Sequence, residues 1–366
     1  MTAETVPGPV PHRVRPTGGP LRIGVVGCGE RGAGCCTAIA RTGNCILAMT
    51  MDANPDRARE LGERFDVPWT TSLEEVLASD GVDAVVISTP HHLHAPQAIA
   101  AVQAGKHVVV EKPLATSLQD AVAVVETARR AGVYVSVNLS YRYLPYVMKA
   151  KALIEAGILG ELQGASLIYQ KERFVDYWAG HTARGSSDWR MRRNTSGGGV
   201  LITMAIHFID LLRYLPGLDV VEVSATHATL ESPGEVEDVA VLWLRYENGA
   251  LGTVNASSCV RGADIVEFRL WGRDGHLSLT PPYQFYSLRL VDGKRPGQWH
   301  AFSGVRSATQ RDVEYFRRFA ERLAHGEAPD VTPEDGLAVQ AIVEAGYRSA
   351  QTGRAERVER ESWCAR

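Results

Sequence analysis

The stretch Leu21–Gly34, LRIGVVGCGERGAG, joins a short apolar run to a glycine-rich turn. The run Ile23–Val26 predicts a buried strand, and three glycines follow it in the spacing Gly27-x-Gly29-x-x-Gly32. In a strand–turn–helix unit the first glycine makes the tight turn, the second lets a pyrophosphate approach, and the third packs the helix on the strand. The stretch therefore predicts the start of a dinucleotide-binding fold.

A second strand, Cys45–Asp52, follows the helix predicted over Ala33–Arg41. Its last residue, Asp52, lies 20 residues after Gly32, where a carboxylate meets the adenosine ribose hydroxyls and repels a 2′-phosphate. This favours NAD(H) over NADP(H) as the cofactor. The alternative is that Asp52 only caps a helix that starts near Pro55.

The alternation of strands and helices continues to about residue 140. Strands are expected within 82–89, 107–113 and 133–140, and helices within 96–105 and 117–132. The strands are almost wholly apolar, as in a parallel sheet that is covered on both faces. The fold class is therefore α/β, with a doubly wound Rossmann domain.

Length and composition set the domain organisation. The 366 residues suffice for two domains: a Rossmann NAD-binding domain over 21–140 and a second α/β domain over 141–366. Residues 1–20 are rich in Pro and Gly and lack the apolar core of a signal peptide, so we expect a disordered leader.

Charge and cysteine content exclude several classes of function. The net charge of −3 provides no basic face for nucleic acid, and no apolar run reaches the ~18 residues of a membrane span. Six cysteines without a C-x-x-C pair fit reduced thiols in the cytoplasm better than disulfides or a zinc site.

Three polar segments, STPHHLH, EKP and NLSYRYLP, follow strands of the predicted sheet. Ligands of such folds bind at the carboxyl ends of the strands, so these segments converge there. Three histidines cluster in the first segment, but no carboxylate or cysteine completes a metal site; one of them contacts the cofactor or caps the next helix. The residues expected to face the cofactor are Gly27, Gly29, Glu30, Arg31, Gly32, Asp52, Thr89, Pro90, His91, His94, Glu111, Lys112 and Asn138.

Lys112 ends a buried strand and precedes Pro113, which restrains it to an extended conformation. A lysine at this edge can hydrogen-bond a substrate oxygen, or exchange a proton if burial lowers its pKa. Its neighbour Glu111 should point to the opposite side. The alternative is a surface lysine at the entry to a loop.

The segments GVVGCGERG, STPHHLHAPQAIAAVQAGKHVVVEKPLA, SGGGVLITMAIHFIDLLRYL and YENGALGTVNAS together resemble the glucose–fructose oxidoreductase/inositol dehydrogenase (Gfo/Idh/MocA) family. The resemblance implies a two-domain NAD(P)-dependent oxidoreductase that acts on sugars or cyclitols. It also implies a C-terminal α/β domain with a large, open-faced, mostly antiparallel sheet, often used to form homo-oligomers. Lys112 matches the family's catalytic lysine and His207 its catalytic histidine.

The segment 197–210, GGGVLITMAIHFID, departs from the family's G-G-G-x-L-x-D-x-G-x-H pattern. Thr203 replaces the Asp and Ala205 the second Gly. Helical spacing places four residues on one polar stripe: Thr203, His207, Asp210 and Tyr214. His207 therefore faces the substrate rather than the core, and Asp210 could orient its imidazole. The alternative is a structural histidine. Further pocket-lining candidates are Arg142, Tyr143, Trp189 and Arg190.

We therefore predict hydride transfer between nicotinamide and a secondary alcohol or ketone carbon of a sugar, cyclitol or amino-sugar, for which an aminoglycoside is one candidate. Lys112 and His207 handle the proton; which of them accepts it directly stays open. Alternatives are a glycosidase or lyase with transient internal redox of NAD, and a non-catalytic NAD-binding sensor.

Overall fold

The computed structural model describes residues 19–173, 175–178, 188–302 and 310–359. The expected leader lies largely outside these residues. The chain forms two compact units, and each unit is built from three separate segments of the chain. Unit 1 consists of 1–115, 119–138 and 312–334; unit 2 consists of 116–118, 139–311 and 335–366.

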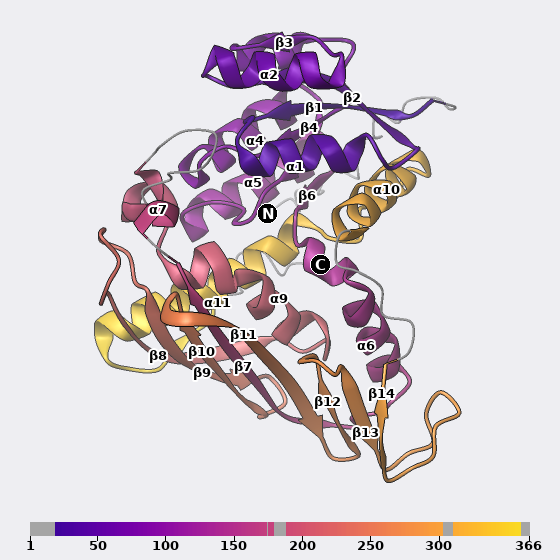
Figure 1. Cartoon of the computed structure of the whole chain (residues 1–366), viewed down its shortest axis with the longest axis vertical. Helices are drawn as coiled ribbons and strands as arrows, with labels where there is room; N and C mark the ends of the chain where they lie inside the picture. The colour runs from indigo at the N-terminus through magenta and orange to yellow at the C-terminus, as the bar shows by residue number, and fades with distance from the viewer. Residues whose placement is uncertain (1–18, 174, 179–187, 303–309, 360–366) are drawn as a thin grey trace, which may run out of the picture. The chain divides into compact units, whose positions relative to one another are not determined.

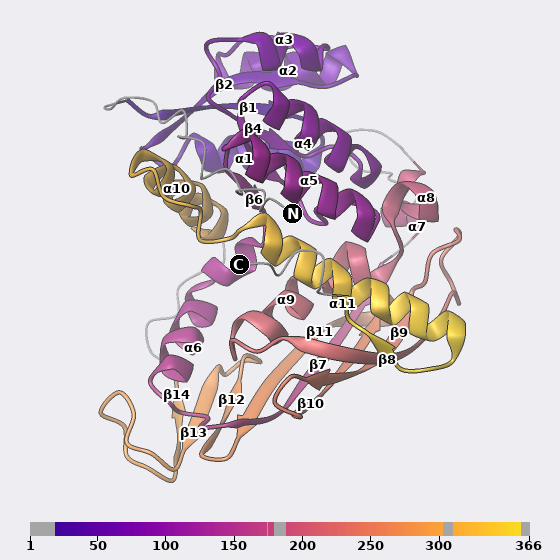
Figure 2. The same ribbon diagram turned by 180° about the vertical axis from the view of Figure 1, so that it is seen from behind.

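Unit 1 contains a six-stranded parallel sheet in the order β3-β2-β1-β4-β5-β6. Helix α1 lies in front of this sheet in Figure 1, and α4 and α5 lie in front of it in Figure 2, so helices cover both faces. Its elements are β1 (Leu21–Val26), α1 (Glu30–Ile39), β2 (Cys45–Met51), α2 (Pro55–Phe65), β3 (Trp69–Thr70), α3 (Leu73–Ala78), β4 (Ala84–Ile87), η1 (His91–Leu93), α4 (His94–Gln103), β5 (His107–Val110), α5 (Leu118–Ala131), β6 (Val135–Val137) and α10 (Arg311–Ala324).

The return of the chain to unit 1 differs from the single boundary expected near residue 140. Helix α10 buries Tyr315, Phe316 and Phe319, and the Tyr315 hydroxyl lies 2.5 Å from the Ser136 hydroxyl on β6. The Ser136 hydroxyl also donates to the carbonyl of Val331. The apolar face of α10 thus completes the Rossmann core, which local sequence patterns do not reveal.

Unit 2 contains a nine-stranded, mostly antiparallel sheet in the order β14-β13-β12-β11-β7-β10-β9-β8-β15, in which only β7 and β10 pair in parallel. Its elements are η2 (Ser140–Tyr143), α6 (Pro145–Glu155), β7 (Leu162–Glu172), α7 (Val175–Trp178), η3 (Trp189–Met191), α8 (Arg193–Ser196), η4 (Leu201–Ala205), α9 (Ile206–Tyr214), β8 (Val220–Ala228), β9 (Val239–Tyr246), β10 (Leu251–Ser257), β11 (Cys259–Gly272), β12 (Gly275–Ser278), β13 (Gln284–Ser287), β14 (Gln298–Ala301), α11 (Pro333–Thr352) and β15 (Glu356–Arg357).

One face of the unit 2 sheet packs on helices and the other is open. The Tyr246 hydroxyl on β9 donates to the carbonyl of Leu212 on α9, and Gly346 of α11 lies against Leu242. On the opposite face, Trp243 of β9 is 62% exposed. The predicted α/β class, with a Rossmann domain and an open-faced antiparallel sheet, is confirmed.

The segment before α9 differs from the predicted α-helix. Leu201–Ala205 form a π-helical turn, so the side chains there do not follow the 100° spacing assumed from the sequence. Together with α8 and α9, this turn forms a 22-residue segment, Arg193–Tyr214, that is long and apolar enough to cross a membrane. Its most apolar window is 78% buried, as in the core helix of a folded domain.

Candidate functional site

The glycine turn after β1 has the geometry that its sequence predicts. Gly27 has φ +94°, and a Cβ there would lie 2.7 Å from the Ser88 backbone at the end of β4. A Cβ at Gly32 would collide with the carbonyl of Gly27, so α1 packs directly on the turn. Gly29, which precedes α1, faces open space. The turn therefore leaves room for an anionic group at the start of α1.

Asp52 sits at the end of β2, beside this turn. Its carboxylate accepts the backbone N–H of Cys28 at 2.7 Å and that of Asn54 at 2.8 Å. The cap of α2 is Asn54, whose side chain accepts from the N–H of Asp56, so Asp52 is not the cap. A carboxylate has about four acceptor positions, and Asp52 therefore keeps capacity for ribose hydroxyls.

Two of the residues expected at the cofactor, Arg31 and Glu111, form an ion pair with each other. The Arg31 guanidinium donates to Glu111 at 2.5 Å and to Asp312 at 2.8 Å. Asn138 donates to the same Glu111 oxygen at 2.7 Å. Burial lowers the pKa of Arg31, but the carboxylates of Glu111 and Asp312 outweigh this effect and hold the pKa above its ordinary value. This network holds the start of α1 against the ends of β5 and β6.

Lys112 is half-buried at the end of β5, and its peptide bond to Pro113 is cis. The buried His94 holds the following backbone: its Nδ1 lies 2.7 Å from the carbonyl of Pro113 and its Nε2 lies 2.9 Å from that of Thr89. Burial lowers the pKa of His94, and the positive charge of Lys112 lowers it further. His94 therefore lies between two backbone carbonyls next to Lys112, and its contact with the cofactor stays a prediction.

His207 lies on α9 and is half-exposed, whereas Thr203 and Asp210 are buried. Its imidazole stacks on the ring of Tyr141, with centroids 4.1 Å apart and planes 4° apart. The Thr203 hydroxyl donates to the carbonyl of Gly199 at 2.6 Å. Of the polar stripe expected from helical spacing, His207 and Tyr214 are half-exposed, whereas Thr203 is bound to the backbone.

Asp210 is held by Arg142 rather than placed to orient the imidazole. Arg142 Nε and Nη2 donate to the two carboxylate oxygens of Asp210 at 2.8 and 2.5 Å, and Arg142 also contacts Asp335 at 3.1 Å. Arg142 is 5% exposed, so it is not the pocket-lining residue that was expected. Burial raises the pKa of Asp210, and the guanidinium opposes this rise. The pair anchors η2 to α9.

Glu237 holds the glycine triplet, a role that the sequence did not suggest. Its carboxylate accepts the N–H groups of Gly199 and Leu201 at 2.7 and 3.1 Å and the hydroxyl of Tyr347 at 2.8 Å. A Cβ at Gly199 would lie 1.8 Å from the Glu237 carbonyl, which accounts for a glycine there. Burial raises the pKa of Glu237, and the hydrogen bonds oppose this rise.

The remaining pocket candidates lie in different surroundings. Tyr143 is buried, whereas Trp189 and Arg190 are half-exposed. The Arg190 guanidinium lies over the rings of Trp189 and Tyr177, at 4.6 and 5.1 Å from their centres. The Trp189 ring is thus partly covered by the Arg190 guanidinium.

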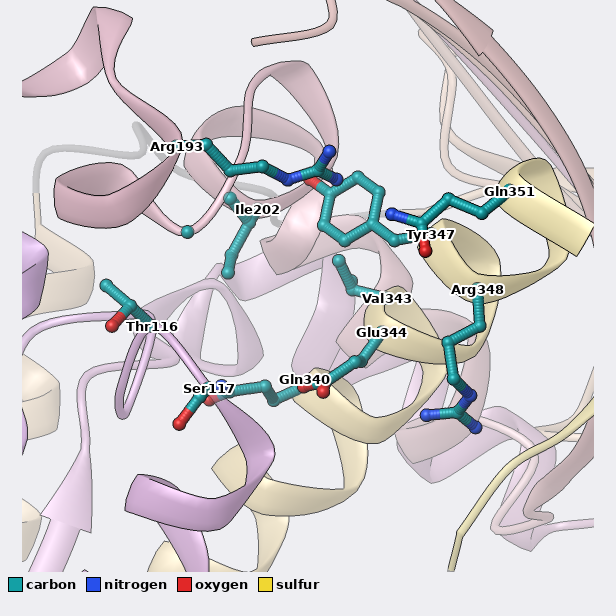
Figure 3. A pocket seen from close by; sticks show the side chains of 11 residues that line it. Thr116, Ser117, Arg193, Ile202, Gln340, Val343, Glu344, Tyr347, Arg348 and Gln351 are labelled. Carbon is teal, nitrogen blue, oxygen red and sulfur yellow. The ribbon is translucent and has the colours of Figure 1, made fainter. Parts of the chain in front are cut away.

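A cavity of about 240 Å³ opens beside the glycine triplet (Figure 3). Arg193 lies over the Tyr347 ring at one side of this cavity, and Glu344 and Arg348 line another side. Neither Lys112 nor His207 is among its lining residues.

Two family descriptions match the chain. Residues 21–139 match the oxidoreductase family with an NAD-binding Rossmann fold, and residues 147–278 match the GFO/IDH/MocA C-terminal domain. The chain belongs to the GFO/IDH/MocA family. It is therefore an NAD-dependent oxidoreductase of the type that includes sugar and cyclitol dehydrogenases.

The GFO/IDH/MocA relatives include a levoglucosan dehydrogenase from Pseudarthrobacter phenanthrenivorans, 29% identical over 63% of this chain and 64% of that protein. A myo-inositol 2-dehydrogenase from Thermotoga maritima is 26% identical over 93% of this chain and 99% of its own length. The structure of the WlbA dehydrogenase from Bordetella pertussis, in complex with NADH and UDP-GlcNAcA, has 28% identity and a TM-score of 0.80 over 93% of this chain and 100% of that chain.

The residues of unit 1 fit the NAD of a GFO/IDH/MocA oxidoreductase. Besides the open space at Gly29, two buried oxygens, Ser88 Oγ and Asn138 Oδ1, have no hydrogen-bond partner among the described residues. Buried polar atoms are rarely left unsatisfied, and NAD carries amide and hydroxyl donors. Ser88 was not predicted; its place at the end of β4, next to Gly27, is the signal that could have revealed it.

Proposed function

We propose that this GFO/IDH/MocA oxidoreductase interconverts a secondary alcohol and a ketone on a sugar, cyclitol or amino-sugar, with Lys112 and His207 as its catalytic residues. Bound NAD supplies the hydride acceptor or donor. In the oxidising direction, the substrate hydroxyl must lose its proton as hydride leaves its carbon. His207 accepts this proton, and the Lys112 ammonium donates a hydrogen bond to the reacting oxygen.

The observation that carries this assignment is the setting of His207 in unit 2. His207 is half-exposed and its imidazole is stacked on Tyr141, whereas Thr203 and Asp210 on the same helical face are buried. Since Asp210 is held by Arg142 and Thr203 is neutral, no carboxylate at these two positions is available to share the proton. This leaves His207 and Lys112 as the groups to which we assign the proton.

The relatives support a carbohydrate substrate. Their names include levoglucosan and myo-inositol, and the WlbA dehydrogenase structure contains an acidic amino-sugar nucleotide. An amino-sugar of a natural product, such as an aminoglycoside, belongs to the same chemical class of polyhydroxylated rings. It is the specific substrate that we would test beside simple sugars and inositols.

The first experiment follows absorbance at the reduced-nicotinamide band, with NAD⁺ or NADP⁺ and a panel of sugars, cyclitols and aminoglycosides. We expect a signal with NAD⁺ and one substrate class, or with NADH and the oxidised sugar. Tightly retained NAD with substrate cleavage but no net absorbance change would favour the glycosidase or lyase. NAD binding without turnover in either direction would favour the sensor.

The catalytic residues are tested by Lys112→Ala and His207→Ala. Loss of general acid–base catalysis costs about 10²- to 10⁴-fold, so kcat should fall by that range in each variant while NADH still binds. The matched controls are Lys294→Ala and His325→Ala, which change exposed side chains. Near-normal turnover of both catalytic variants would contradict the mechanism.

We also propose that a second copy of this chain covers the open face of the unit 2 sheet. A cross-strand row of this face includes Leu251 and Trp271, which are 54% and 38% exposed, and ends at Trp299 of β14, which is 50% exposed. Gly164 lies between the first two and lets the Trp271 indole lie flat on the sheet. Such a patch on a monomer is rare, which favours a homo-oligomer.

The compartment is part of the same proposal. The five cysteines within the described residues are free thiols, and four of them are buried in unit 1. Free thiols persist in a reducing environment. This supports a cytoplasmic location.

A further inference from the structure

The imidazole of His207 is one layer of a three-part stack within unit 2. Tyr141 lies parallel to it at 4.1 Å, and the Arg311 guanidinium lies over the Tyr141 ring at 4.4 Å from the ring centre. Two planar groups this close to one centroid must occupy opposite faces of the ring. We propose that Tyr141, backed by Arg311, is a positioning residue that sets the plane of the His207 imidazole and supports its protonated form.

The phenol of Tyr141 is fixed by its own neighbours. Tyr141 and Arg142 are consecutive residues of η2, and Arg142 makes the buried, two-point contact with Asp210, three residues after His207. The ring of Phe208 meets the Tyr141 ring edge-on, at 5.3 Å and 88°. Both residues of η2 therefore hold the same helix, α9, and the ring has little freedom to slide along it.

Stacking on Tyr141 fixes the orientation of the His207 ring without using either ring nitrogen. A parallel ring at 4.1 Å blocks rotation of the imidazole about its χ2 bond, but both nitrogen atoms stay at the ring edge. The face of a phenol is electron-rich and attracts a cation, so it interacts more strongly with imidazolium than with imidazole. On the function proposed above, on which this inference rests, His207 becomes imidazolium when it takes the hydroxyl proton.

Arg311 places a permanent positive charge on the far side of the same ring. It holds the phenol in place by a cation–π contact. The other charged or titratable groups of unit 2 near the stack include Asp210 with Arg142, which neutralise each other, Tyr169, whose ring contacts Phe208, and Tyr146 of α6, which interacts with Tyr141 and Arg311. Burial raises the pKa values of Tyr169 and Tyr146 above their ordinary values.

The decisive comparison is Tyr141→Phe against Tyr141→Leu, because phenylalanine keeps the aromatic face and leucine removes it. Misplacing a catalytic group by about 1 Å can cost ~100-fold, so kcat of Tyr141→Leu should fall about 10- to 100-fold. KM and the NADH dissociation constant should stay near the wild-type values. Tyr141→Phe should keep kcat within about threefold. Trp69→Leu, which changes an exposed aromatic residue of unit 1, is the control.

A second readout does not depend on turnover. The imidazole protons of His207, assigned by comparison with His207→Gln, should show an upfield ring-current shift in wild type and Tyr141→Phe that is lost in Tyr141→Leu. Loss of a cation–π contact should also lower the His207 pKa, and with it one limb of the pH–rate profile, by about 0.5 to 1 pH unit. A purely structural role of Tyr141 would move neither readout selectively.

The outcomes separate this inference from the function on which it rests. An unchanged kcat and unchanged His207 resonances in Tyr141→Leu would overturn the stack, as would equal damage in Tyr141→Phe and Tyr141→Leu. If His207→Ala is slow but Tyr141→Leu is normal, the proposed function stands and this inference alone fails. If His207→Ala turns over normally, the proposed function fails first, whatever the resonances show.

Discussion

Asp52 and Asp210 show how one residue type takes different roles at different positions. Asp52 is half-exposed and accepts two backbone amides beside the glycine turn, so its charge is available to a ligand. Asp210 is 1% exposed, and its charge is matched by the guanidinium of Arg142. Breaking such a buried pair costs about 3–5 kcal/mol, so Asp210 contributes to stability rather than to recognition.

Asp52→Asn tests the cofactor preference. Loss of the negative charge removes the repulsion of a 2′-phosphate, and the ratio of kcat/KM for NAD over NADP should fall by at least about 10-fold. Asp56→Asn, which changes an exposed carboxylate nearby, is the control and should leave this ratio unchanged. An unaltered ratio in Asp52→Asn would show that another group selects the cofactor.

His94 predicts a pH dependence of stability. Burial lowers the pKa of His94 in the folded chain below the unfolded value of about 6.5. In the pH interval between these two pKa values, the unfolded state binds more protons than the folded state. The free energy of unfolding should therefore fall as the pH drops below about 6.5 and through the folded pKa. Each pH unit of that interval contributes about 1.4 kcal/mol. Chemical denaturation at pH 7.5 and 5.5 should show a smaller drop for His94→Gln than for wild type and the exposed-site control His325→Gln.

Among the elements, the two glycine-rich segments have different physical causes. Gly29 precedes α1 and faces open space, which indicates room for a ligand. Gly199 precedes the π-helical turn, and its small size lets the buried Glu237 cap that turn. The glycine at position 29 thus leaves room for a ligand, whereas the glycine at position 199 allows close packing.

Gly199→Ala and Gly29→Ala form a matched pair. The Cβ at Gly199 would overlap the Glu237 carbonyl, and overpacking of this kind costs about 1–3 kcal/mol or more of unfolding free energy. The Cβ at Gly29 meets nothing within 4 Å, so Gly29→Ala should keep its melting temperature but bind NADH at least about 10-fold more weakly. Calorimetry and fluorescence titration measure the two effects. Destabilisation by Gly29→Ala with normal NADH affinity would contradict this distinction.

At the scale of the whole molecule, the chain passes repeatedly between its two units. Helix α10 belongs to the Rossmann unit although it follows most of the second unit in sequence. The open sheet of unit 2 leaves large apolar side chains on its surface, including Trp243 and Trp271. Burial of such side chains contributes about 1.5–3 kcal/mol each, which is the driving force for the proposed self-association.

Trp271→Glu and Trp243→Glu test this association. A charge on either side chain should be costly at a covered surface, so sedimentation equilibrium should show a smaller assembly than for wild type. Trp69→Glu changes a tryptophan of similar exposure in unit 1 and should leave the assembly unchanged. A monomeric wild type would contradict the proposal.

The sequence by itself determined the fold class, the glycine turn, and the positions of Asp52, Lys112 and His207 at the ends or starts of elements. These follow from local spacing, because strand and helix periods and the conformational demands of a tight turn are properties of neighbouring residues. The apolar runs of β4 and β5 likewise predicted a sheet covered on both faces.

Only the tertiary structure decided which polar groups meet. Arg142 binds Asp210 across 68 positions, and Arg31 reaches Asp312 across 281 positions, so no local pattern could assign them. The stack of Tyr141 on His207 and the capping of Gly199 by Glu237 likewise join residues that are far apart in sequence. The physical reason is that a buried charge or ring takes the partner that packing brings to it, whereas a turn or strand depends on its neighbours along the chain.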